Sequence, residues 1–169
     1  MPKRQIEINV FKDYRKTVKT VWLRQVVSVI INIVDPNGNK GASLVIADDD
    51  TLRKLNFDFR GFDETTDVLS FGQSGTVHGE NHPELENSPL HNVETFPEQF
   101  EELGNMGEVI ISFPQTARQA LEHGNAIAEE LALLIVHGIL HLFGFDHTYP
   151  EEEIEMKTLE RQALARIKS

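Results

Sequence analysis

The sequence contains no cysteine, which excludes disulfide bonds and thiolate metal sites. Any bound metal must therefore be held by nitrogen and oxygen ligands. A hydrophobic run long enough to span a membrane is also missing, because the most apolar stretch, residues 131–145, is short and contains two histidines. That stretch predicts a buried helix. The first 16 residues lack a continuous apolar segment, so we expect no secretory signal and predict a cytoplasmic protein without membrane contact.

Positive charge is absent from a long central part of the chain. Residues 61–117 contain 11 Asp and Glu and no Lys or Arg, whereas residues 1–60 contain 11 Lys and Arg against 7 Asp and Glu. The formal net charge of −11 argues weakly against nucleic-acid binding, but phosphate contacts need only a local basic patch. The candidate patch is Lys12, Arg15, Lys16, Lys19 and Arg24. The alternative interpretation is an ordinary solvated helix face.

The length of 169 residues, with 40% apolar and 25% charged residues, predicts one globular domain over residues 1–169. Alternating or short apolar segments predict strands at 5–11, 42–47, 67–71 and 107–112. Apolar residues at helical spacing predict helices at 14–34, 48–59, 114–124, 125–144 and 149–167. Ser112 and Gln115 are spaced as a capping box, and Asn125 is the expected cap of the helix that follows.

Residues 72–106, between two predicted strands, are rich in Gly, Pro, Asn, Ser and Glu and show no sustained periodicity. They predict a long acidic surface loop inserted into the domain and dispensable for its fold. An acidic loop would repel RNA, so we expect it to point away from a nucleic-acid cleft. His78 and His82 could bind metal, but such a loop is a poor preformed site.

The segment HGILHLFGFDH, residues 137–147, places three histidines in apolar surroundings. On a helix, His137 and His141 lie one turn apart on the same face. Gly144 falls where the helix would end in a left-handed turn, which allows the chain to reverse and bring His147 back. Three neutral imidazoles with an open fourth position are typical of a catalytic zinc site. The alternative, three core histidines each bonded to backbone, does not explain this spacing.

Gly138 distinguishes this segment from the zinc-binding motif of conventional metalloproteases. In the protease motif HExxH, the residue after the first histidine is a glutamate that serves as general base. Without that base, a metal can still supply the nucleophile, because it lowers the pKa of bound water to about 7. Asp146, next to His147, could orient a ligand or bind such a water.

Three segments together resemble the YbeY family of bacterial single-strand-specific endoribonucleases, which act in rRNA maturation. HGILHLFGFDH resembles the family signature, LNFDFRGFDETTDVLSF at 55–71 resembles its second conserved block, and MGEVIIS at 106–112 resembles a family strand. Met156 also matches a position where the family tends to have methionine. The chain departs from the pattern at Glu108, where Asp is usual, at Gly72, where Pro is usual, and in its longer loop.

The resemblance implies an α+β fold in which a small mixed sheet packs with helices, a zincin-like hydrolase with a central metal-binding helix. It also implies one zinc ion per chain, bound by His137, His141 and His147. Arg60, the arginine of the second block, is implied to be catalytic. Its guanidinium could clamp phosphate oxygens, so we expect it to face the zinc.

The other polar residues of the second block have two interpretations each. Thr66, Asp67 and Ser70 could line the active-site cleft. Equally, Asp67 could cap a turn and Ser70 could face solvent from its strand.

The function expected from these features is zinc-dependent cleavage of single-stranded RNA. It would serve rRNA maturation, in particular at the 3′ end of small-subunit rRNA, and ribosome quality control, with the ribosome as partner. We expect the RNA path to run from the zinc past Arg60 to a helix face that bears Arg15, Lys19 and Arg24. Two alternatives stay open: a metal-dependent hydrolase of a non-RNA substrate, and a ribosome-assembly factor with structural zinc.

Overall fold

The computed structural model describes residues 4–72, 77–79 and 104–168. Its strands are β1 (Ile6–Val10), β2 (Gly41–Ala47), β3 (Val68–Gly72), β4 (Val77–Gly79) and β5 (Asn105–Ser112). Its α-helices are α1 (Thr20–Val34), α2 (Asp49–Arg60), α4 (Phe113–His123), α5 (Ile127–Leu142) and α6 (Pro150–Lys168), and a 3-10 turn, η1, covers Lys12–Tyr14.

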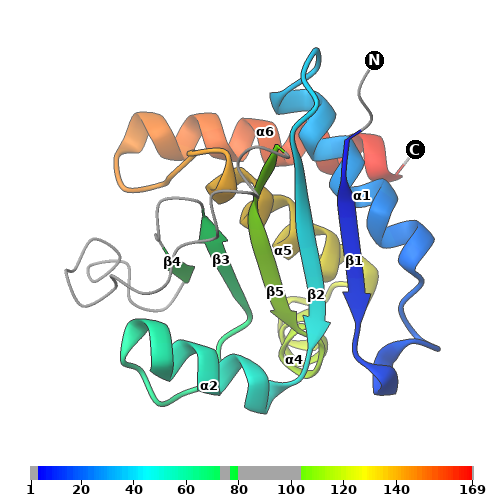
Figure 1. Cartoon of the computed structure of the whole chain (residues 1–169), viewed down its shortest axis with the longest axis vertical. Helices are drawn as coiled ribbons and strands as arrows, with labels where there is room; N and C mark the ends of the chain where they lie inside the picture. Colours follow the sequence, from blue (N-terminus) through cyan, green and yellow to red (C-terminus); the bar gives the residue numbers. More distant parts are fainter. Residues whose placement is uncertain (1–3, 73–76, 80–103, 169) are drawn as a thin grey trace.

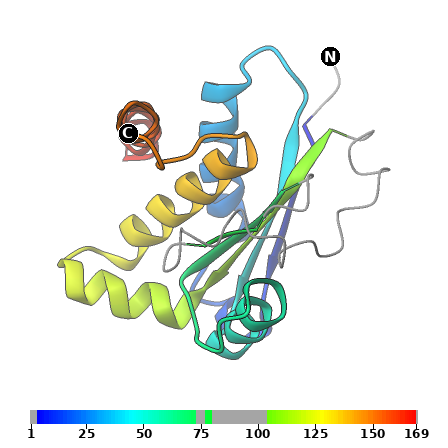
Figure 2. The same cartoon turned by 90° about the vertical axis from the view of Figure 1, so that its left-hand side faces the viewer.

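The five strands form one mixed sheet in the order β1-β2-β5-β3-β4 (Figure 1). β1, β2 and β5 are parallel, whereas β3 is antiparallel to both β5 and β4. Seen nearly edge-on in Figure 2, the sheet has α1, α5 and α6 on one side and α2 on the other. This arrangement confirms the predicted α+β fold with a small mixed sheet.

The main hydrophobic core lies between the sheet and α5. This helix buries 11 of its 16 residues, which is why its sequence is apolar almost all round. α1 packs its own apolar face, including Leu23, Val27 and Ile30, into the same core. A smaller core on the opposite face joins α2 to β3 and β4. The helix that carries the histidines is therefore central, as predicted.

Local capping signals determine where several helices begin and end. Ser112 Oγ accepts a hydrogen bond from the backbone N–H of Gln115, as the capping-box spacing predicts. α4 ends at Gly124, which has a φ of 69°. The predicted cap Asn125 is wrong by one residue, because Ala126 precedes α5 and the Asn125 N–H bonds to the end of α4 at Ala120.

The first helix is shorter than predicted. It begins at Thr20 rather than near residue 14, because η1 and a turn occupy the preceding residues. In that turn, the backbone N–H of Val18 bonds to the carbonyl of Tyr14, and Val18 is buried in the main core. Lys19 has an extended backbone, with a ψ of 129°. Core packing before the helix therefore outweighs the helical periodicity of the sequence.

The predicted loop over 72–106 contains more regular structure than its composition indicated. Gly72 belongs to β3, residues 77–79 form β4, and β5 begins at Asn105. Val77 is only 3% exposed and packs in the smaller core, so we expect this part of the segment to contribute to the stability of the fold, contrary to the prediction from composition. Residues 80–103, with His82 and His91, lie outside the described residues.

No single helix in the described ranges is long and apolar enough to cross a membrane. α4 and α5 meet the length and composition criteria only together, as a pair bent by 115°.

Gly138 allows α5 to approach the sheet closely. A Cβ atom at this position would lie 2.7 Å from Val109 Cγ1 and 3.1 Å from Ser70 Oγ. The glutamate that metalloproteases have here has no room between α5 and the strands β5 and β3. The residue type at position 138 is therefore determined by packing as well as by the chemistry of the site.

We expect Gly138→Ala to lower the free energy of unfolding by about 1–2 kcal/mol, measured by urea denaturation. Overpacking costs about 1–3 kcal/mol, and the better helix propensity of alanine returns up to about 1 kcal/mol. Because the nearest clash is with Val109, the double variant Gly138→Ala, Val109→Ala should be more stable than the sum of the single effects. Strictly additive effects would show that the clash is relieved elsewhere.

Candidate metal centre and adjoining cleft

The end of α5 turns the chain so that three histidines converge. His137 and His141 lie one turn apart on α5. The N–H of Gly144 then bonds to the His141 carbonyl, and the N–H of Phe145 bonds to the Leu140 carbonyl. This is a Schellman motif, and Gly144 has the left-handed φ of 90° that it requires. The chain therefore reverses after the helix and returns His147 to its side, as predicted.

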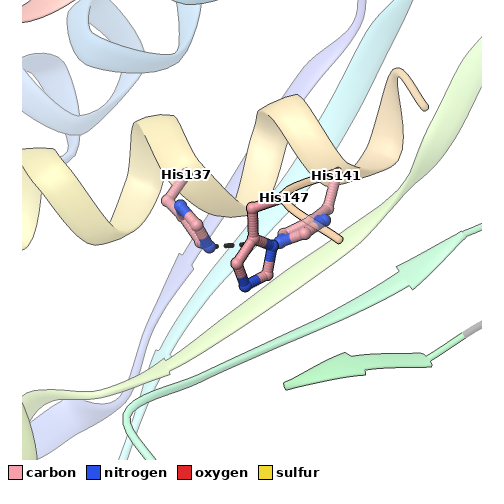
Figure 3. A group of neighbouring side chains, drawn as sticks. All are labelled: His137, His141 and His147. Carbon is pink, nitrogen blue, oxygen red and sulfur yellow. Dashed lines mark hydrogen bonds between the residues drawn. The ribbon is translucent and has the colours of Figure 1, made fainter. Parts of the chain in front are cut away.

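The three imidazole groups face a common point (Figure 3). One nitrogen from each of His137, His141 and His147 lies within 4.8 Å of the others, and the Nε2 atoms of His137 and His141 are 3.1 Å apart. Tetrahedral zinc with bonds of about 2.0–2.1 Å would separate two ligand nitrogens by roughly 3.3 Å. The cluster thus has the dimensions of a metal site and could hold one ion.

Burial keeps the central histidine of the cluster neutral and therefore able to bind a metal. His141 is only 5% exposed. Burial, followed by repulsion from the neighbouring histidines, lowers its pKa to about 2. A neutral imidazole has a free nitrogen lone pair at neutral pH, so protons do not compete with a metal for this residue.

A carboxylate lies beside each of the other two histidines. Oε1 of Glu160, on α6, lies 2.7 Å from Nδ1 of His137, which leaves Nε2 of that ring for an ion. Oδ1 of Asp146 lies 3.3 Å from Nδ1 of His147 and accepts the backbone N–H of the same residue. Because Nδ1 of His147 has no hydrogen-bond partner among the described residues, the orienting role of Asp146 stays a prediction. Glu160 was missed, because an acid on an amphipathic helix is usually a solvated surface residue.

Hydrogen bonds also keep Asp146 ionised. Burial acts to raise the pKa of its carboxyl group, but the N–H of His147 and the hydroxyl of Thr148 outweigh burial and hold the pKa below its usual value. An ionised Asp146 carboxylate places negative charge 3.3 Å from the His147 ring, which favours a cation at the cluster.

A fourth histidine lies against the cluster. The ring of His78, on β4, stacks on that of His141 with centroids 4.4 Å apart and planes inclined by 13°. His78 is not among the residues whose nitrogens converge. The strand that carries it comes from the segment predicted to point away from the site, so that expectation is wrong for residues 77–79.

A cleft of about 450 Å³ opens beside His137 and His147. α4, α5 and α6 form most of its walls, and Leu134 and Met156 contribute apolar surface. Its ionisable lining is mostly acidic: Asp67, Glu130, Glu153 and Glu160, together with His123 and Lys157. Lys157 forms an ion pair of 2.9 Å with Glu153, which leaves the cleft acidic.

The polar residues of the second block divide between two roles. Asp67 lines the cleft, and its Oδ1 also accepts the N–H of Val68 at the start of β3, so both interpretations of Asp67 hold. Thr66 is buried and its hydroxyl bonds to Asp67. Ser70 neither faces solvent nor lines this cleft, because its buried hydroxyl donates to the Gly138 carbonyl on α5.

Arg60 does not face the histidines. Its guanidinium bonds to Asn56 and to the carbonyl of Gly79, and a side chain at Gly79 would overlap it. Gly79 pairs with Leu69, whose side chain packs on the α2 side of the sheet. Alternation along β4 therefore places Arg60 on one face of the sheet and His78 on the other. The expectation that Arg60 points at the metal is wrong in this structure.

The basic residues near the N-terminus do not share one helix face either. Arg15 precedes α1 and donates to the carbonyl of Val10, Lys19 immediately precedes α1, and Arg24 donates to the carbonyl of Ile6. None of the three lines the cleft beside the histidines. The predicted path past Arg60 to a basic helix face is therefore not the course of this cleft.

The fold and the site together define a single-domain α+β protein with a three-histidine group that could hold a metal ion. A family model described as Endoribonuclease YbeY matches residues 5–168. The chain therefore belongs to this family, which confirms the resemblance found in three segments of the sequence.

Individual relatives agree with this assignment. A Dehalococcoides mccartyi protein named Endoribonuclease YbeY is 36% identical over 98% of this chain and 92% of its own length. A protein of the same name from Paramagnetospirillum magneticum is 36% identical over 83% of this chain and 76% of its own. The solution structure of TM1509 from Thermotoga maritima has a TM-score of 0.56 and 23% identity, covering 96% of this chain and 91% of that one. At this identity the structural match supports the fold alone.

Proposed function

We propose that this protein is a zinc-dependent endoribonuclease that cleaves single-stranded RNA during rRNA maturation. The convergence of His137, His141 and His147 beside a cleft is the observation that carries the proposal. Membership in a family described as Endoribonuclease YbeY supports RNA as the substrate. Processing of the small-subunit rRNA 3′ end, ribosome quality control and a cytoplasmic location with the ribosome as partner are parts of the same proposal.

The donor set fits zinc. It consists of nitrogens, His141 is neutral, and Glu160 holds the Nδ1 side of His137 so that Nε2 remains for an ion. A zinc ion in this site would act as a Lewis acid and lower the pKa of water to about 7. Within the part of the chain that the structure describes, the set has three protein ligands, whereas structural zinc normally has four, which favours a catalytic rather than a structural role.

The cleft residues determine how a substrate can be held. Asp67 and Glu130 are buried carboxylates in the wall, so a phosphate group would be repelled unless a cation lies close to it. We therefore place the reacting phosphate at the histidine cluster and the neighbouring base over the apolar surface of Leu134 and Met156. The guanidinium of Arg60 lies on the other face of the sheet and does not contact the histidine cluster. The catalytic role implied for Arg60 therefore stays a prediction.

The acidic lining also favours one alternative, a metal-dependent hydrolase with a non-RNA substrate.

Metal analysis of purified protein, combined with cleavage assays on a defined single-stranded RNA before and after chelation, tests the proposal. We expect about one zinc per chain, loss of cleavage on chelation and recovery when zinc is returned. Protein purified without bound metal, or cleavage that survives chelation, would contradict it. Metal-bound protein that leaves RNA intact would favour the alternative.

Of the three basic residues on the predicted RNA path, Lys19 can be tested most cleanly, since Arg15 and Arg24 also bond to backbone carbonyls. If Lys19 contacts a phosphate, Lys19→Glu should weaken RNA binding and flatten the slope of log affinity against log salt by about 0.7. Fluorescence anisotropy with a labelled single strand measures this slope.

Lys54→Glu is the matched control, because Lys54 is an exposed lysine of α2 and the net charge changes equally. If both variants change binding alike, the effect of Lys19 reflects net charge and not a contact.

A further inference from the structure

We infer that His78 is a positioning residue for the metal centre: its ring, stacked on that of His141, holds this ligand in the plane in which it binds a metal. The inference rests on the metal site of the proposed function but not on RNA as the substrate. It assigns a specific role at the site to β4, a strand that the sequence predicted as loop.

The stacking geometry restricts one ligand directly. The two rings are nearly parallel, with planes inclined by 13° and centroids 4.4 Å apart. If the His141 ring tilted out of its present plane, it would either clash with the ring of His78 or leave a gap between the two rings. His137 and His147 each have a carboxylate oxygen near Nδ1, whereas a ring face supports His141. Glu160 thus holds the ring of His137 by a bond to Nδ1, and His78 supports the ring of His141 by stacking.

His78 is itself held firmly enough to act as a support. β4 pairs with β3, and His78 lies opposite Ser70, whose hydroxyl bonds to the Gly138 carbonyl on α5. On the other face of the sheet, Val77 packs in the smaller core and the carbonyl of Gly79 accepts a bond from Arg60. The residues on both sides of His78 are therefore anchored on the α2 side while its ring points to α5.

These contacts also give Arg60 an indirect link to the metal centre. Its guanidinium occupies the space above Gly79 that any larger residue would fill. The neighbouring residue along the strand is His78, which contacts His141. The connection from Arg60 to a metal ligand thus runs through β4, without contact between the guanidinium and the histidine cluster.

Zinc affinity of the full-length chain, measured by competition with a chelating dye, tests the inference. Aromatic pairs of this kind contribute enough that His78→Ala should bind zinc roughly 2- to 12-fold more weakly. His78→Phe keeps a ring face without nitrogens, so it should restore most of the affinity. The visible absorption of the cobalt-substituted protein should change in His78→Ala and return towards wild type in His78→Phe.

The controls separate positioning from other effects. His82→Ala removes an imidazole from the same segment and should leave zinc affinity unchanged, and the metal-free His78→Ala protein should unfold near the wild-type temperature. Unchanged affinity in His78→Ala, or an equal loss in His82→Ala, would overturn the inference. So would a His78→Phe variant as weak as His78→Ala, because a nitrogen and not the ring face would then matter. If the wild type binds no zinc, the proposed function fails as well; if it binds zinc and only the His78 effect is absent, the proposed function stands.

Discussion

Replacing His141 with alanine is expected to remove most of the bound metal and, with it, the proposed RNA cleavage. The Nε2 atom of His141 lies 3.1 Å from that of His137, so its loss leaves two of three converging ligands. Orienting partners of metal ligands change affinity by about 10–100-fold, and loss of a ligand should exceed this range. Metal content after dialysis, measured by mass spectrometry, and cleavage of a single-stranded RNA record the two effects.

The replacement also removes a ring from the core, since His141 is 5% exposed. His141→Phe keeps a ring in contact with His78 and lacks the nitrogens, so it separates loss of coordination from loss of packing. Both variants should lose metal, and the phenylalanine variant should retain more of the thermal stability of the metal-free protein. A His141→Phe protein that still holds one zinc per chain would show that His141 is not a ligand.

The second large effect is expected from replacing Glu160, whose carboxylate contacts the ring of His137 and not the metal position itself. Its carboxylate lies 2.7 Å from Nδ1 of His137, where it fixes the ring orientation and increases the donor strength of Nε2. Glu160→Gln should weaken zinc binding by about 10–100-fold, because the amide lacks the negative charge. A competition titration measures the change in dissociation constant.

Glu155 provides the matched control for this variant. It is an exposed glutamate on the same helix, α6, so Glu155→Gln changes the net charge equally. Its zinc affinity should match that of the wild type. If the two variants weaken binding to the same extent, the effect comes from the overall charge of α6, and the bond to His137 has no special role.

Most of the candidate metal site was predictable because its signals are local. His137 and His141 are four residues apart on one helix, and Gly144 ends that helix with hydrogen bonds that span only a few residues. The capping of α4 by Ser112 is local in the same way. By contrast, the first helix was predicted too long, because the buried position of Val18 depends on residues of other elements.

The sequence by itself determined the order of the elements apart from β4 and η1, the three converging histidines and the family, since short-range spacing and motifs specify all of these. Only the tertiary structure decided which residues surround the histidines. Glu160 reaches His137 across 23 residues of chain, and His78 meets His141 through the pairing of β4 with β3. The face of the sheet on which Arg60 lies was decided in the same way, by the side of the sheet on which α2 packs. Such contacts depend on strand register and helix packing, and no periodicity in the sequence encodes them.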